Sequence, residues 1–148
     1  MSINSKNILL SGLASGITII ISALAMVPVV GNEMDRALAN RGLPPLSGPA
    51  MAFFGMVSLV TGIVLVWLYA VAKARFGPGK KTAAIVSITV WFLAYFLCNV
   101  SMVVYGFMPI RLTVIGTAWG LVELLLAGFI GSCLYQEKTS FVRSHETK

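Results

Sequence analysis

Of the 148 residues, 57% are hydrophobic and only 11% are charged. A soluble domain has about 25% charged residues, so this composition lacks the polar surface that water requires and predicts an integral membrane protein. The formal net charge of +6 does not indicate nucleic-acid binding, because the basic residues lie between apolar runs and do not cluster on one folded face.

Four apolar stretches are each longer than the ~20 residues that a helix needs to cross the hydrocarbon core of a bilayer. The first three contain no charged residue, and the fourth contains only Glu123. The sequence therefore predicts an all-α fold, a bundle of four transmembrane helices in one domain over residues 1–137, followed by a polar cytoplasmic tail over residues 138–148. The predicted helices cover residues 8–30, 51–72, 82–107 and 112–135.

The first stretch has one alternative interpretation. Lys6, the apolar run and Ala23-Leu24-Ala25 resemble a signal peptide with its cleavage site. The run continues to Val30, however, which is long for a signal peptide, and its Gly and Ser residues recur at helical spacing. We therefore expect the first helix to be retained and to pack against its neighbours.

The connection between the first two stretches contains signals for a short helix. Asn32 is a good N-cap and Glu33 falls in the first turn, while Gly42 provides a C-terminal stop before Pro44. We expect a short extracytoplasmic helix over about Glu33–Arg41, which lies on the membrane surface or caps the bundle. A solvated loop with one helical turn is the alternative.

The basic residues outside the apolar stretches predict the orientation of the chain. Three of them fall on one side of the membrane, namely Arg36, Arg41 and Arg111, and eight fall on the other, namely Lys6, Lys73, Arg75, Lys80, Lys81, Lys138, Arg143 and Lys148. Because cytoplasmic segments carry the excess of Lys and Arg, we expect both termini to be cytoplasmic.

Several motifs are similar to those of a known group of proteins: Gly42-Leu43-Pro44-Pro45, Val66-Trp67-Leu68-Tyr69-Ala70, Phe76-Gly77-Pro78-Gly79, Trp119-Gly120-Leu121-Val122-Glu123 and Leu134-Tyr135. From about Asn7 to Glu137, the chain resembles small, uncharacterised bacterial four-helix membrane proteins. The resemblance implies a location in the bacterial plasma (inner) membrane and implies no catalytic activity.

Glu123 is the strongest candidate for a functional side chain. It lies about midway along the fourth stretch, where a charged carboxylate is costly. Small residues at a spacing of three or four share its helical face, which favours close helix contact and directs the carboxyl group into the bundle. These residues are Gly116, Gly120, Ala127 and Gly131. No lysine or arginine occurs at its depth, so we expect Glu123 to be protonated near neutral pH.

Counting residues from the outer helix ends places four polar side chains within about one helical turn of Glu123. They are Thr18, Ser22, Thr61 and Asn99. Gly12 and Gly16 lie beside a polar stripe on the first helix, which contains Ser11, Ser15, Thr18 and Ser22, and they allow close packing. Three aromatic residues, Trp91, Tyr95 and Trp119, lie deeper in the spans; we expect them to pack in the core, and lining a cavity is the alternative.

This set of residues has two interpretations. In the first, Glu123, Asn99, Thr18, Ser22 and Thr61 form a small polar cavity that binds a proton, a cation or a polar substrate. In the second, a neutral Glu123 is hydrogen-bonded to Thr, Ser or Asn and ties the helices together. Both interpretations require the carboxyl group to be buried.

The chain offers little for catalysis. Cys98 and Cys133 differ too much in depth to form a disulfide, and His145 is the only histidine. We therefore predict no metal site and no cofactor, and an enzyme is disfavoured.

Three functions remain. The first is a non-catalytic polytopic membrane protein whose partners are the lipid bilayer and a second copy or a larger membrane complex. The second is a small transporter or ligand-binding protein that uses Glu123. The third is a membrane enzyme acting on lipid, with Glu33 and Asp35 as its acids.

Overall fold

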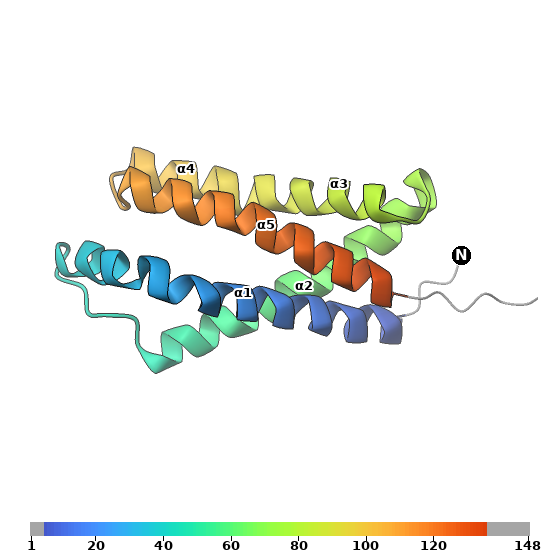
Figure 1. Ribbon diagram of the computed structural model, residues 1–148, viewed down its shortest axis with the longest axis horizontal. Helices are drawn as coiled ribbons and strands as arrows, with labels where there is room; N and C mark the ends of the chain where they lie inside the picture. The colour runs from blue at the N-terminus through green and yellow to red at the C-terminus, as the bar shows by residue number, and fades with distance from the viewer. Residues whose placement is uncertain (1–4, 136–148) are drawn as a thin grey trace, which may run out of the picture.

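The computed structural model describes residues 5–135, which form four long helical segments (Figure 1). α3 and α4 are joined without a break by the π-helical turn η1, so residues 80–104 run as one segment. All four segments are long and apolar enough to cross a membrane, which confirms the predicted all-helical chain with four candidate spans. The elements are α1 Ser5–Ala39, α2 Gly48–Phe76, α3 Lys80–Trp91, η1 Phe92–Phe96, α4 Leu97–Val104 and α5 Ile110–Leu134.

The separate short helix predicted over Glu33–Arg41 is not found. α1 instead continues from Ser5 to Ala39, so Asn32 lies inside this helix and does not cap a new one. Nothing between Pro28 and the end of α1 interrupts the backbone, and a proline is tolerated within a membrane-spanning helix. The first helix is therefore longer than predicted and includes most of the segment that was assigned to the connection.

α1 and α4 end in the same backbone motif. Gly42 and Gly106 both have φ of +69°, a conformation that favours glycine. In each motif the amide after the glycine bonds to the carbonyl five residues back, at 3.0 Å in the first and 2.8 Å in the second, as in a Schellman cap. Arg41 connects the two ends, because its guanidinium donates to the carbonyl oxygens of Ala37, at 3.1 Å, and of Gly106.

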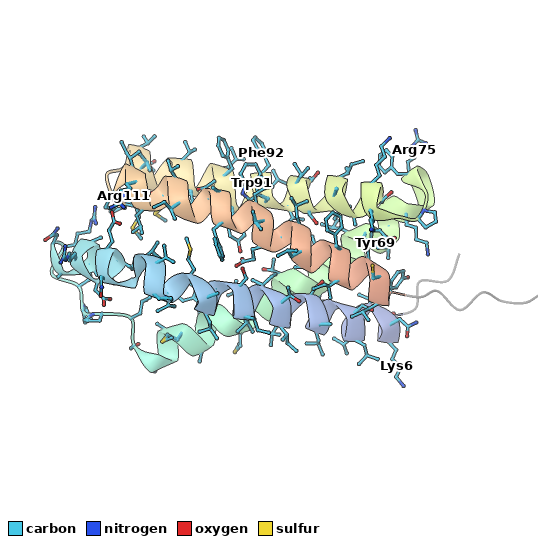
Figure 2. The ribbon with its side chains drawn as sticks, in the orientation of Figure 1. Lys6, Tyr69, Arg75, Trp91, Phe92 and Arg111 are labelled. Atoms are coloured by element: carbon cyan, nitrogen blue, oxygen red, sulfur yellow. The ribbon has the colours of Figure 1, made fainter. Side chains whose placement is uncertain are left out.

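The two ends of the bundle differ in charge. At one end, which we call the basic end, α1 begins, residues 77–79 join α2 to α3, and α5 ends (Figure 1). At the opposite end, the loop end, lie the connections 40–47 and 105–109. Figure 2 shows Lys6 and Arg75 at the basic end and Arg111 at the loop end.

α1 and α2 cross closely in the half of the bundle that belongs to the basic end. A Cβ atom at Gly12 would lie 2.5 Å from the Cα of Ile63, and one at Gly16 would lie 2.6 Å from the Cα of Leu59. A Cβ at Gly62, between them on α2, would overlap the backbone of α1. Only glycine therefore permits this crossing, where the predicted packing residues Gly12 and Gly16 are found.

Buried residues concentrate in the same half. Two clusters form the core there, the first made of Ile8, Val66, Tyr69, Ala70, Ala83 and Tyr135 and the second of Ile19, Leu65, Val86, Leu124 and Ala127. We call this part the basic half; it contains residues 5–22, 58–90 and 120–135. The loop half contains residues 23–57 and 91–119, and within it neither α4 nor residues 48–57 of α2 contribute a buried residue.

Candidate functional site

Glu123 lies in the middle of α5, at the boundary between the two halves, and is only 4% exposed. The Tyr95 hydroxyl, from η1, donates a hydrogen bond of 2.9 Å to Oε1 of Glu123. The Ser22 side chain of α1 lies near the carboxyl group and interacts with it electrostatically. The carboxyl group of Glu123 on α5 therefore meets side chains from α1 and η1, which are distant from it in sequence.

Trp119 extends this network by one further bond. Its indole Nε1 donates to Oγ of Ser22 at 3.0 Å, so Ser22 lies between an indole and a carboxyl group. A buried carboxyl group with such partners has its hydrogen-bonding requirements met inside the protein. We call Glu123, Tyr95, Ser22 and Trp119 the carboxyl network.

Two backbone features position Tyr95: a π-helical turn in the third span and a glycine in α5. The residue lies in the π-helical turn η1, which widens one turn of the third span. Such turns are rare and often occur at functional sites. The ring packs directly on Gly120 of α5, where an added Cβ would lie 2.7 Å from Cε1 of Tyr95. Gly120, one of the predicted packing glycines, therefore makes room for the ring one turn from Glu123.

Of the four polar neighbours predicted for Glu123, the structure brings only Ser22 to it. Thr18 donates to the carbonyl of Ala14 at 2.9 Å, and Thr61 donates to that of Val57 at 2.8 Å. Both hydroxyl groups thus bond to the backbone of their own helix, which is a common arrangement for threonine in membrane helices.

Asn99 belongs to a second polar cluster in the loop half. Its Nδ2 donates to Oγ1 of Thr117 at 2.8 Å, and Trp91 Nε1 donates to the Thr117 carbonyl at 2.8 Å. Thr117 precedes Glu123 by six residues, which corresponds to about 9 Å along the helix. The predicted Asn99 therefore connects the third and fourth spans but does not lie at the carboxyl group.

For two members of the carboxyl network, Tyr95 and Trp119, the sequence favours packing over lining a cavity and predicts no hydrogen bond to Glu123. Tyr95 and Trp119 both have polar atoms, and the depth count that selected serine, threonine and asparagine applies equally to a phenol. Buried Tyr and Trp normally find a hydrogen-bond partner for their polar atom. This signal identifies Tyr95 as a partner for Glu123.

The small face of α5 continues from Glu123 into the basic half. Ser15, which is fully buried, donates to the carbonyl of Ala127 at 2.5 Å and so joins α1 to α5. Ser87 of α3 fits against Gly128, where a Cβ would overlap its hydroxyl oxygen, and this oxygen has no hydrogen-bond partner. On the opposite side of Glu123, the predicted packing residue Gly116 faces open space, because no atom lies within 4 Å of the position that a Cβ would take there.

The chemistry of the site is limited to one carboxyl group and its donors. Within residues 5–135, no group of three His, Cys, Asp or Glu side chains is arranged to hold a metal ion. Glu33, one of the two acids considered for a lipid enzyme, pairs with Arg111 at 3.4 Å, and Asp35 is exposed. Glu123 is therefore suited to holding a proton or accepting hydrogen bonds.

Comparison of the chain with models of known protein families, with curated proteins and with solved structures finds no match. The interpretation of the site rests on its geometry.

Proposed function

We propose that this chain is a non-catalytic, multi-pass protein of the bacterial plasma membrane that associates through its loop half with a second copy or with another membrane protein. Four apolar helical segments support the insertion into a membrane. Lys6 and the four basic residues of 73–81 lie at one end. This charge distribution supports an orientation with both termini in the cytoplasm.

The observation that carries the proposed association is a difference between glycines. In the basic half, backbone atoms of the neighbouring helix occupy the space beside Gly12, Gly16 and Gly62. In the loop half, Gly55 and Gly116 have no atom within 4 Å of a Cβ position. Small residues in membrane helices concentrate at helix contacts. Two such residues without a contact inside the chain point to a helix from another chain.

A groove in the loop half supports the same proposal. A cavity of about 520 Å³ lies between the third and fourth spans, with valine, isoleucine and leucine side chains on its walls. Asn99, Thr113 and Thr117 also line it, but the Asn99 amide bonds to the Thr117 hydroxyl and that hydroxyl to the Thr113 carbonyl. The groove therefore offers an incoming apolar helix a complementary shape.

The two native cysteines allow a direct test, because both are exposed and each half contains one. In bilayers treated with copper-phenanthroline, a Cys133→Ser variant, which retains Cys98 in the loop half, should form a covalent dimer. A Cys98→Ser variant, which retains Cys133 in the basic half, should stay monomeric. The association is wrong if neither variant forms a dimer, no membrane protein copurifies stoichiometrically, and light scattering gives a monomer.

The orientation has its own test. A reporter fused at Gly42 should lie outside the cytoplasm, and reporters fused at Gly79 and at the C-terminus should lie in the cytoplasm, because the basic residues favour the cytoplasmic side. A C-terminal fusion that reads outside would overturn the orientation and leave the proposed association unaffected.

A second candidate function is binding of a proton or cation by Glu123, as in a small transporter. One observation favours it: Gly116 lies two helical turns from Glu123 on the same face of α5, and the space over Gly116 is open. Infrared difference spectra that show no carboxyl band lost in Glu123→Gln between pH 5 and 9 would exclude titration of this group.

A further inference from the structure

A second groove lies at the basic end, between the start of α3 and the last turns of α5. This cavity of about 460 Å³ is lined by Lys80 and by four residues of α5, namely Phe129, Ile130, Cys133 and Leu134. The α5 side chains are apolar, and Lys80 is exposed at the first position of α3. The groove thus combines a long apolar wall inside the span with one cationic group at its end.

The surroundings of Lys80 are positively charged. Residues 73–81 contain Lys73, Arg75, Lys80 and Lys81 and no acidic residue. Within residues 5–135 the acidic residues are Glu33 and Asp35, in the last turns of α1 near the loop end, and the buried Glu123. Among the described residues, no carboxylate pairs with Arg75, Lys80 or Lys81, so an anion placed at this end is attracted by these three cations.

The N-terminus of α3 adds oriented donors to this charge. Its N-cap residue, Gly79, has no side chain to bond the first amides of the helix. The first N–H groups of a helix have no partner within the helix and favour an anion at that end. The Gly79 amide itself bonds to the Tyr69 hydroxyl at 3.2 Å, and the Thr82 hydroxyl bonds to the Gly77 carbonyl at 2.7 Å. These two bonds hold the turn in place below the helix start.

We propose that the basic end binds one anionic phospholipid, with its phosphate at Lys80 and the first turn of α3 and an acyl chain in the groove along α5. The apolar wall fits a hydrocarbon chain, and Arg75, Lys80 and Lys81, which pair with no carboxylate within residues 5–135, fit a headgroup with net negative charge. A choline headgroup carries its own cation, which the neighbouring lysines repel. This inference is independent of the association proposed for the loop half, which involves the opposite end of the bundle.

Native mass spectrometry of the detergent-purified chain tests this site with phosphatidylglycerol and phosphatidylcholine of identical acyl chains. The wild type should retain one phosphatidylglycerol in preference to phosphatidylcholine. Lys80→Gln should lower phosphatidylglycerol affinity about five-fold, the factor expected when one basic residue near a lipid phosphate is removed. Lys81→Gln removes the same charge from a neighbour that does not line the groove, so it should lower the affinity for phosphatidylglycerol less than Lys80→Gln does.

A variant of the groove wall separates a specific site from diffuse attraction to charge. Cys133→Phe fills the groove without altering the charge and should reduce binding of phosphatidylglycerol, while Cys98→Phe, at an exposed position on α4, should not. Equal retention of the two lipids by the wild type would overturn the proposal. Equal losses in Lys80→Gln and Lys81→Gln, or full binding in Cys133→Phe, would overturn it as well.

Discussion

In the basic half of the bundle α1 contacts α2 and α5 through glycine and serine, whereas in the loop half α2 diverges from α1 (Figure 1). α2 contains both arrangements. Its second half packs Gly62 against the backbone of α1, while its first half exposes Phe53, Phe54 and Met56. One helix of nearly uniform hydrophobicity is thus tightly packed at one end and open at the other.

The difference follows from the forces that act between helices in a bilayer. Lipid tails are as apolar as leucine, so helices gain little from burying apolar side chains against each other. Close contact instead requires small residues and hydrogen bonds between helices. The basic half has both, in Gly12, Gly16 and Gly62 and in the bond from Ser15 to Ala127. The loop half has small residues without a contact, which leaves it available to a partner.

The largest expected effect on stability comes from replacing a glycine of α2 by leucine, at Gly62 in the packed half and at Gly55 in the open half. Gly62→Leu should destabilise the fold by about 3 kcal/mol or more, because the new side chain would overlap backbone that cannot move aside as a side chain would. Gly55→Leu makes the same change seven residues earlier in the same helix, where the space is open, and should leave the melting temperature of the monomer unchanged. It should weaken dimer formation through Cys98. Equal melting temperatures for the two variants would remove the distinction between the halves.

The carboxyl network at the boundary gives the next effect. Glu123→Leu should cost about 1–3 kcal/mol, because the buried Tyr95 hydroxyl is left without its acceptor. Glu123→Gln keeps the shape and an acceptor oxygen, so its loss in stability should be smaller. The measurement is thermal unfolding of both variants in the same detergent. A Gln variant as unstable as the Leu variant would mean that the ionisable group, and not the hydrogen bonds, is essential.

The sequence was sufficient for the four spans and for the burial of Glu123, because both depend on hydropathy and on residue spacing within single helices. It was not sufficient for the end of α1. Asn32 and Glu33 favour the start of a helix, but a capping residue begins a helix only where the preceding backbone has left the helical conformation. Residues 28–31 remain helical, so the capping signal has no effect.

Counting depth brought Asn99 to Glu123, where the structure has Tyr95, for a geometric reason. Depth was counted for Asn99 from Phe107, but α4 ends three residues earlier, at Val104, which shifts the estimate by about 4.5 Å. Depth also leaves open which way a side chain faces around its helix. η1 changes that direction within the third span, and nothing in residues 92–96 marks a π-helical turn in advance.

A single hydroxyl group gives a smaller effect. Tyr95→Phe removes the donor to Glu123 and keeps the ring on Gly120, so it should cost about 1 kcal/mol. Tyr105→Phe makes the same change at a residue that is 75% exposed and should have no effect on the melting temperature. The double variant Tyr95→Phe/Glu123→Gln should lose less unfolding free energy than the sum of the two single variants, because the two residues are in direct contact. Additive losses would show that the hydroxyl does not act through Glu123.

The smallest effect is expected at the loop end, where the ion pair between Arg111 and Glu33 joins the fourth span to the first. Arg111 is 78% exposed and its Nη1 lies 3.4 Å from the Glu33 carboxylate. Exposed pairs of this kind contribute about 0–1 kcal/mol, so Arg111→Gln should barely change the melting temperature at low salt or at high salt. Arg41→Gln is the matched control, since this guanidinium bonds backbone carbonyls at the ends of α1 and α4. It should destabilise more than Arg111→Gln, because two terminal carbonyls lose their donor. If Arg111→Gln instead produced the larger, salt-sensitive loss, the loop half would be held together by charge and would be less open to a partner than its unfilled glycines indicate.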